Sequence, residues 1–159
     1  MTTSLVMALL AVQAVGSGGP DCRQDSAAVR EVLAVASGIV DADNARDVER
    51  VLGYYAADAV LMPPGEGPVG GLAAIRPRYV SLFEAFTPQI ELQVDEVCAG
   101  GGLAFVRGRN RGRLVARAGG ASRELDDAFV MLLRRGTAGG FRISHLIWHR
   151  ASGGPAATK

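Results

Sequence analysis

Residues suited to proton transfer are concentrated in the last third of the chain. Asp127 lies two residues before Phe129 in an apolar stretch. The two histidines, His145 and His149, occupy the next apolar stretch. A carboxylate among apolar side chains loses hydration, which raises its pKa and suits it to acid–base catalysis, and histidine changes charge near neutral pH. Asp127 and His145 are therefore candidate catalytic residues. The structural alternatives are an ion pair between Asp127 and Arg111 and hydrogen-bonded histidines in the core.

Tyr55 is the third candidate catalytic residue. Its place in the apolar spacing puts it on the buried stripe of a short helix that begins after Asn44. From there its hydroxyl can donate a hydrogen bond into a cavity, as an oxyanion-stabilising tyrosine does, or it can simply cap the core. Phe83 lies on the buried stripe of a later helix and is expected to contact a ligand in the same cavity.

The spacing of the histidines argues against a metal site. His145 and His149 are four residues apart in an expected strand, which separates their Cα atoms by roughly 13 Å. The sequence has no CxxC pair and no other His/Cys spacing typical of zinc. It also has no nucleotide-phosphate loop, so we expect neither a metal nor a cofactor.

Two kinds of apolar spacing define the elements that position these residues. A helical period predicts helices over residues 25–40, 44–55 and 72–86. A short strand is expected over 58–62, with a tight hairpin at 65–71. A period of two then predicts strands over residues 90–98, 103–116, 122–135 and 141–150. This order predicts an α+β fold in which three N-terminal helices pack on a curved antiparallel β-sheet.

Alternate residues of a strand share a face, so the turns decide which side chains meet. A hairpin turn at 117–121 pairs Arg109 with Phe129, and one at 136–140 pairs Met131 with His145. The odd-numbered residues then form one face: Leu103, Phe105, Arg107, Arg109, Arg111, Leu125, Asp127, Phe129, Met131, Ile143, His145, Ile147 and His149. An apolar face with a small polar island is typical of a ligand pocket. Its expected ligand contacts are Phe129, Met131, Arg109 and His149.

The opposite face of the strands is expected to point away from the helices. Leu146 and Trp148 have the parity opposite to the histidines and would fit a dimer interface. The alternating arginines over 107–113 have two interpretations. In the first, they attract an anionic ligand. In the second, they form a solvated row or the rim of a dimer interface, and they pair with the acidic residues of the next strand. Burying arginine without a partner is costly, which favours the second interpretation.

Composition restricts the kinds of partner. The chain has 159 residues, of which 48% are hydrophobic, enough to fill the core of one domain. Its net charge of +1 argues against a protein that binds the phosphate backbone of a nucleic acid. No run of about 20 apolar residues predicts a membrane span.

The first 20 residues are expected to be a signal peptide and linker. The run over 5–15 has the length of a signal-peptide apolar region and is followed by small residues, although no Lys or Arg precedes it. The alternative is an apolar appendage on a cytoplasmic protein. Export would favour a disulfide between Cys22 and Cys98, and otherwise the two are unrelated thiols. The folded domain is expected over 21–150 and a flexible tail over 151–159.

Several segments resemble the NTF2-like superfamily, and more narrowly its SnoaL-like and DUF4440-type branch. The segments are Tyr55–Pro63, Gly70-Gly71 entering a helix with Ile75, Gly101–Gly108, and Phe141–His145 leading to Trp148. The resemblance covers about residues 25–150 and implies a ketosteroid-isomerase-like, cystatin-like cone. Such families include ketosteroid isomerases, polyketide cyclases, epoxide hydrolases, dehydratases and non-enzymatic binding or assembly domains. Many members are dimers that pair through the outer face of the sheet, which implies a homodimer here.

Because fold does not select among these activities, three functions stay open. The favoured one is a domain of unassigned activity that binds a small apolar molecule in a central pocket. The second is an isomerase, cyclase or hydrolase in which Asp127, His145 and Tyr55 converge on one cavity. The third is an assembly module with a filled cavity and a large apolar outer face.

Overall fold

The computed structural model describes residues 26–150. The predicted signal peptide and linker (1–20), the tail (151–159) and Cys22 lie outside the described residues and stay predictions. Cys98 lies inside them and is not a free thiol. Across residues 26–150, no helix is both long and apolar enough to cross a membrane.

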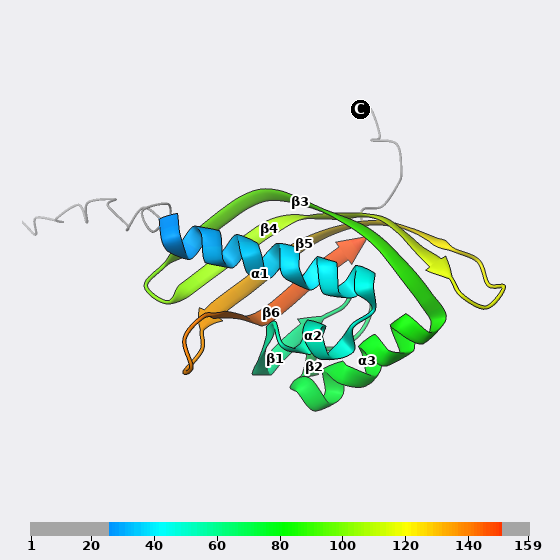
Figure 1. Cartoon of the computed structure of the whole chain (residues 1–159), viewed down its shortest axis with the longest axis horizontal. Coiled ribbons are helices and arrows are strands. Elements are labelled where there is room, and N and C mark those ends of the chain that lie inside the picture. Colours follow the sequence, from blue (N-terminus) through cyan, green and yellow to red (C-terminus); the bar gives the residue numbers. More distant parts are fainter. Residues whose placement is uncertain (1–25, 151–159) are drawn as a thin grey trace, which may run out of the picture.

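In the described part of the chain, three helices precede most of the sheet, as the apolar spacing predicts (Figure 1). α1 (Ser26–Ala45) continues past the predicted end at Val40, because its buried stripe extends to Ala42. α2 (Val48–Leu52) is capped by Asp47, whose carboxylate accepts a hydrogen bond from the backbone N–H of Arg50 at 3.0 Å. α3 (Leu72–Ala85) includes Pro77.

The structure places Tyr55 on a strand, so its predicted position on a helix is wrong. α2 ends at Leu52 with Gly53 as its C-cap, and β1 (Tyr55–Met62) begins immediately afterwards. Tyr55 pairs with Ile143 of the last strand. A five-residue helix gains little from its own hydrogen bonds, whereas an aromatic residue packs well in a strand.

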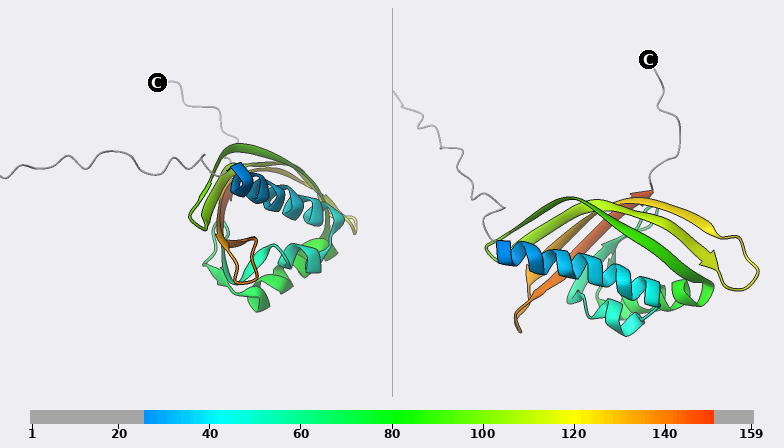
Figure 2. Two further views of the ribbon diagram at one scale, coloured as in Figure 1. Left: turned by 60° about the vertical axis from the view of Figure 1, so that its left-hand side comes forward. Right: turned by 45° about the horizontal axis from the view of Figure 1, so that its top comes forward.

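Within residues 26–150, six strands form one curved sheet with the order β2-β1-β6-β5-β4-β3. The remaining strands are β2 (Val69–Gly70), β3 (Phe86–Gly100), β4 (Leu103–Ala116), β5 (Arg123–Arg135) and β6 (Phe141–Arg150). β3 to β6 pair as successive antiparallel neighbours, whereas β1 pairs with β6 in parallel. The α+β prediction is confirmed, but the sheet is mixed rather than wholly antiparallel. Figure 2 shows the sheet curling around α1, with α3 beneath its open side.

Two glycines of β4 allow this curvature. A Cβ on Gly108 would lie 2.2 Å from the carbonyl oxygen of Gln93 on β3. Gly112 has a φ of +131°, and a Cβ there would lie 1.9 Å from the carbonyl oxygen of Gln89. Only glycine lets the two backbones approach so closely, and such positions are where sheets bend. A bulge between Val94 and Glu96 of β3 adds to the bend.

The register of β4 against β5 differs by one residue from the predicted register. Asn110, rather than Arg111, faces Asp127. The connection covers residues 117–122, because Ser122 does not continue the strand pairing. Its hydroxyl oxygen instead accepts a hydrogen bond from the backbone N–H of Ala116 at 3.2 Å. A shift of one residue exchanges the two faces of β4, so its even-numbered residues point inward.

The register of β6 against β5 changes at a bulge. Near the turn Leu133 faces Ile143, as predicted. Ser144 then has no partner in β5, and Leu132 faces His145. The Ser144 hydroxyl donates a hydrogen bond to the carbonyl oxygen of Leu132 at 3.2 Å, which holds the extra residue in place. Beyond the bulge, every residue of β6 lies on the face opposite to the predicted one.

Polar contacts tie both ends of α1 to the sheet. Near its start, Glu31 accepts a hydrogen bond from the backbone N–H of Phe141 at 2.9 Å and pairs with Arg135 at 3.2 Å. Near its end, Asn44 donates to the carbonyl oxygen of Ile90 at 2.9 Å and accepts from its N–H at 2.8 Å. The last turn of α1 is thereby fixed against β3.

Candidate functional site

A cavity of about 700 Å³ lies between α3, the end of α1 and the inner face of the sheet. Its apolar lining includes Leu61, Leu82, Ile90, Leu114, Leu125, Phe129, Leu146 and Trp148. Four charged residues of its lining are exposed to solvent: Glu66, Arg123, Glu124 and Arg150. The cavity therefore has an apolar interior and a charged rim, and its volume falls in the range of small-molecule sites.

Asp43, near the end of α1, is one of the residues that line this cavity. The residue as a whole is half-buried, but its Oδ1 atom has no contact with solvent and no hydrogen-bond partner among residues 26–150. Burial raises the pKa of Asp43 from 3.8 to about 8. The carboxyl group is therefore mostly protonated at neutral pH and can donate a hydrogen bond.

Two tyrosines stand beside Asp43. The hydroxyl groups of Tyr55 and Tyr79 form a hydrogen bond of 2.8 Å. Burial raises the pKa of both hydroxyls, and the charge of Asp43 raises them further. Tyr79 lines the cavity, and its ring packs on Phe83 with 5.7 Å between the ring centroids. Only one hydroxyl hydrogen is used in the pair, so the other is available for a third group.

A polar row crosses the inner face of the sheet. Asp127 of β5 lies between Asn110 of β4 and Arg150 of β6, and all three line the cavity. Burial raises the pKa of Asp127, and the positive charge of Arg150 opposes that rise. The Oδ1 atom of Asn110 is buried and, within the described part of the chain, has no hydrogen-bond partner.

The rim carries charges of both signs. Arg78 of α3 pairs with Glu66 at 2.8 Å. The guanidinium of Arg123 lies 4.8 Å from the centroid of the Phe86 ring. Both contacts hold long side chains at the edge of the cavity, where they leave its interior to apolar groups.

Some of the predicted site residues line the cavity, and others are buried in the core without lining it. Asp127 and Phe129 line it. Tyr55 reaches it through the hydroxyl of Tyr79. Met131 and Phe83 are buried in the core, at 4% and 5% exposure, and are not among the lining residues.

The prediction that the odd-numbered residues of the strands share one inner face is wrong for β4, and for β6 beyond the bulge at Ser144. His145, His149 and Arg109 lie on the outer face of the sheet, because the longer β4–β5 connection and the Ser144 bulge each shift the register by one residue. Asp127, His145 and Tyr55 therefore do not converge on one point. Trp148 and Leu146, predicted at a dimer interface, line the cavity instead.

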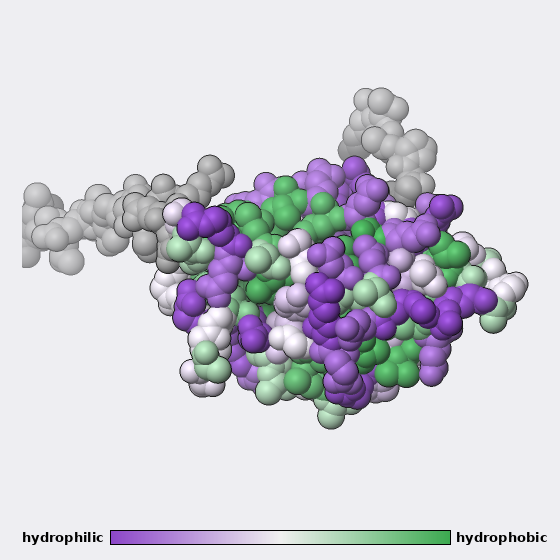
Figure 3. Space-filling view, in the orientation of Figure 1, coloured by the Kyte–Doolittle hydropathy of each residue, from purple (hydrophilic) through white to green (hydrophobic). Residues whose placement is uncertain are grey.

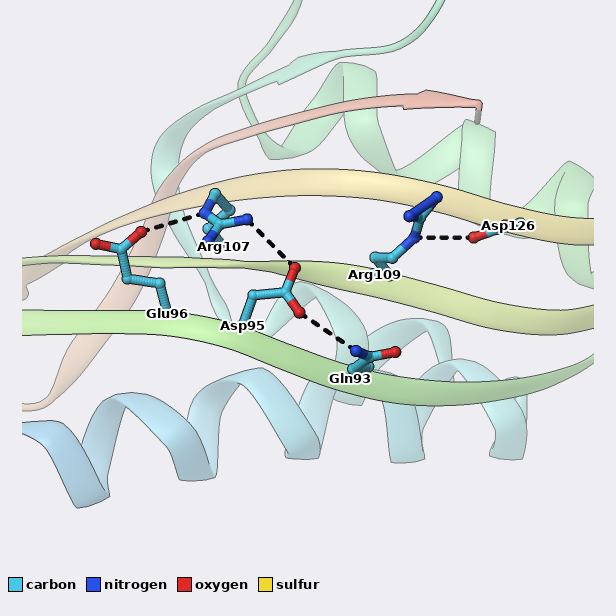
Figure 4. Close-up of polar contacts among 6 residues, drawn as sticks. All are labelled: Gln93, Asp95, Glu96, Arg107, Arg109 and Asp126. Atoms are coloured by element: carbon cyan, nitrogen blue, oxygen red, sulfur yellow. Dashed lines mark hydrogen bonds and ion pairs between the residues drawn. The ribbon is translucent and has the colours of Figure 1, made fainter. Parts of the chain in front are cut away.

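The outer face carries the arginine row as an ion-pair network (Figure 4). Arg107 pairs with Asp95 at 3.3 Å and with Glu96 at 3.2 Å. Arg109 and Arg111 share Asp126, at 3.1 and 3.6 Å. This arrangement agrees with the interpretation of the arginines as a solvated row and not as ligand contacts.

Sequence reasoning missed Asp43 and Asn110, although a signal for each was present. Asp43 follows Val32, Ala36 and Ile39 at helical spacing, so it continues the buried stripe of α1. Asn110 belongs to the even-numbered residues of β4, which carry no charge, whereas the odd-numbered ones include four arginines. The uncharged set is the one that faces inward.

A second hollow lies between the start of α1 and β3. Its volume is about 550 Å³, and its lining includes Val29, Leu33, Val94 and Val97. Figure 3 shows hydrophobic surface along this side of the molecule. No group of three or more His, Cys, Asp or Glu residues within 26–150 is placed to hold a metal ion.

The sequence matches the SnoaL-like domain family over residues 36–146. The chain belongs to this family, which confirms the resemblance to the SnoaL-like branch of the NTF2-like superfamily. The match does not single out the DUF4440-type branch. No curated protein matches the chain.

Solved structures share the fold. A ketosteroid isomerase-like protein from Erwinia carotovora atroseptica is 25% identical, with a TM-score of 0.71 over 82% of this chain and 98% of that one. An NTF2-like superfamily protein from Salmonella enterica is 15% identical, with a TM-score of 0.70 over 84% and 99%. An NTF2-like protein with a cystatin-like fold from Novosphingobium aromaticivorans is 17% identical, with a TM-score of 0.64 over 82% and 86%.

Proposed function

We propose that the chain binds a small, mostly apolar molecule in the cavity between α3 and the sheet. The supporting observation is Asp43, which lines this cavity and carries a carboxyl group whose pKa burial raises to about 8. The protonated carboxyl group has one hydrogen to donate, and an oxygen atom of a ligand in the cavity would accept it.

The apolar lining supplies most of the affinity in this proposal. Phe129 and Trp148 face each other across β5 and β6 and present aromatic surface to the cavity. Aromatic and aliphatic walls with a few polar groups are typical of small-molecule sites. In this proposal Asp43 determines the orientation of the ligand, and the apolar lining supplies most of the binding free energy.

The first prediction concerns two probes of the same shape, tetralin and 1-tetralone, which adds a carbonyl group. We expect 1-tetralone to bind about 3- to 10-fold more tightly below pH 8, because the protonated Asp43 donates a hydrogen bond to its oxygen. The advantage should shrink as the pH rises through about 8 and the carboxyl group ionises. Binding is measured by the fluorescence of Trp148, the only tryptophan of the chain, which lines the cavity.

An Asp43→Leu variant should bind both probes with equal affinity at every pH. Failure of either probe to bind the unmodified protein would contradict the proposed function. Exchange of the probe's α-hydrogens for deuterium in D₂O, lost in Asp43→Leu, would instead identify acid–base catalysis. That outcome would support the isomerase, cyclase or hydrolase alternative, with Asp43 in place of the predicted His145.

We also propose that the chain forms a homodimer through the outer face of the sheet. Leu132 and Ile147 are exposed there at 39% and 40%. They adjoin Phe105 and Met62 on the neighbouring strands. The adjacent row, which includes Arg107, Arg109 and Asp126, carries charges of both signs. Such a row can pair electrostatically with a second copy of itself, as a two-fold interface requires.

The second prediction is that Leu132→Glu weakens this dimer at least about tenfold. A carboxylate at the apolar centre of the interface would lose its hydration without gaining a partner. Sedimentation equilibrium measures the dissociation constant. Val80→Glu is the matched control, because Val80 is 37% exposed but lies on α3, away from this face. A monomeric unmodified protein, or equal effects of the two variants, would contradict the proposal.

A further inference from the structure

The charged side chains around the cavity are not all paired with one another. Arg78 and Glu66 form two hydrogen bonds, at 2.8 and 3.1 Å, so their charges offset each other. The ion pairs among residues 26–150 include neither Arg123 nor Arg150, although both residues line the cavity. Both are exposed, so a molecule that enters the cavity can contact them. Because arginine is always charged in proteins, the cavity carries two accessible cations.

Arg123 is held in place by an aromatic ring. Its guanidinium carbon lies 4.8 Å from the centroid of the Phe86 ring. A ring has no lone pair to accept a hydrogen bond, so this cation–π contact restrains the side chain while its N–H donors keep their capacity to bind an anion. A guanidinium group restrained in this way loses less conformational entropy when it binds.

Arg150 lies nearer to the apolar interior. It is the last residue of β6 and faces Asp127 of β5. Burial raises the pKa of Asp127 and the positive charge of Arg150 opposes that rise, so the two side chains lie close enough to interact. They nevertheless form no ion pair within the described residues, and Asp127 is half-buried whereas Arg150 is exposed. The guanidinium group of Arg150 is therefore accessible to a ligand.

The spacing of the strands relates both arginines to the aromatic lining. Trp148 faces Phe129, and Arg150 follows two residues later on the same face of β6, about 7 Å away. Arg123 lies on the same face of β5 as Phe129, about 13 Å beyond the position that Arg150 faces. An apolar body that packs on Trp148 thus needs only a short arm for an attached charge to reach Arg150.

The acidic residues of the lining oppose a bound anion only weakly. Asp43 is mostly protonated at neutral pH, because burial raises its pKa to about 8. Alternation along β5 places Glu124 on the outer face, where it pairs across the strands with Arg113. Asp127 is the remaining acid beside Arg150, and it is half-buried. The accessible charge at this part of the cavity is therefore mainly positive.

We infer that the ligand is an apolar monocarboxylate, with a compact body against Phe129 and Trp148 and a carboxylate on a short arm at Arg150. Arginine and carboxylate match in shape, because the planar guanidinium group can donate two parallel hydrogen bonds to the two oxygens. Arg123 adds a second positive charge at the same opening. The inference rests on the proposed function and narrows its ligand class. It assigns Arg150 the role of a residue that determines specificity.

The experiment compares three probes that differ in charge alone. They are tetralin-2-acetate, its primary amide and the corresponding ethylamine, which are anionic, neutral and cationic on one bicyclic skeleton. Each is titrated at pH 7 and low ionic strength and followed by the fluorescence of Trp148. The unmodified protein is compared with Arg150→Gln and Arg123→Gln. Arg113→Gln is the matched control, because Arg113 is also exposed but lies on the outer face of β4, where it donates to Gln89.

We expect the acetate to bind about 5-fold more tightly than the amide, and the ethylamine to bind most weakly. Arg150→Gln should make the acetate and the amide bind about equally, Arg123→Gln should reduce the preference to about twofold, and Arg113→Gln should keep it. Added salt should reduce the preference in the unmodified protein. Each result is a ratio of two affinities for one variant, so a general loss of cavity shape does not imitate it. Thermal unfolding shows whether each variant is folded.

Four outcomes would overturn the inference. If the acetate and the amide bind the unmodified protein equally, the arginines do not select the ligand, and the proposed function survives without this ligand class. If the ethylamine binds most tightly, the acidic residues dominate the site. If Arg113→Gln reduces the preference as much as Arg150→Gln does, the effect comes from the total charge of the protein. If none of the probes binds, the proposed function fails and the inference fails with it.

Discussion

Replacing Asp43 by asparagine is expected to stabilise the protein at pH 7 by an amount on the order of 4 kcal/mol. Its carboxyl group has a pKa near 3.8 in the unfolded chain and about 8 in the folded one. Between these values the folded state holds a proton that the unfolded state releases, so stability falls as the pH rises. Each pKa unit between 3.8 and 7 corresponds to about 1.4 kcal/mol. Asparagine is a neutral isostere and does not have this penalty.

Urea denaturation at pH 5, 7 and 8.5 measures the effect. The gain from Asp43→Asn should be small at pH 5, larger at pH 7 and largest above pH 8. Asp41→Asn is the matched control, because it removes the same charge from an exposed position of α1 and should change stability by less than about 0.5 kcal/mol. Parallel pH profiles for the unmodified protein and Asp43→Asn would rule out a buried, protonated Asp43.

A carboxyl group that costs this much stability is difficult to explain by packing alone. A leucine in the same place would continue the apolar stripe of α1 without any penalty from ionisation. Strained or destabilising groups of this kind concentrate at functional sites, where binding depends on them. The stability measurement and the probe titrations therefore examine the same residue from two independent directions.

Elements of this fold were predictable, because periodicity depends on local packing. The bounds of β4 and β6 agree with the predicted strands, and β5 differs from its prediction by one residue at the start. The helical stripe of α1 was also predictable, but its end was not. The pair Asp41 and Asp43 resembles a helix stop, whereas in the structure both lie within α1, where Asp41 is exposed and Asp43 lines the cavity.

The faces of the strands were harder to predict, because they depend on single residues at the turns. A hairpin loop of six residues instead of five exchanges the faces of β4, and one bulged residue at Ser144 exchanges those of β6. For β4, the charges alone indicated the correct face, since four alternating arginines are far costlier to bury than Gly108, Asn110 and Gly112. For β6 no such signal exists, because the bulge interrupts the alternation.

These two register shifts determine the chemistry of the site. They remove both histidines from the cavity and bring Asn110, Trp148 and Arg150 into it. The predicted face offered acid–base groups, whereas the observed one offers a hydrogen-bond acceptor, an aromatic surface and a charged rim. Binding is therefore better supported than the predicted Asp/His/Tyr catalysis.

Gly112→Ala is expected to destabilise the protein by about 3 kcal/mol or more, which lowers Tm by about 10 °C or more. The φ of +131° is strained for any residue with a Cβ, and the new Cβ would lie 1.9 Å from the carbonyl oxygen of Gln89. Because that oxygen belongs to backbone, no side chain can move to relieve the contact. β3 and β4 would have to separate where the sheet bends over the cavity.

Two other glycines separate the causes of this loss. Gly70→Ala meets no atom within 4 Å and has an ordinary φ, so thermal denaturation should show little change. Gly119→Ala also meets no atom but has a φ of +64°, so it should lose about 1 kcal/mol from backbone strain alone. A Gly112→Ala loss no greater than that of Gly119→Ala would mean that the close approach to Gln89 is not needed. The bend of the sheet, and with it the place of Asn110 in the cavity, would then need another cause.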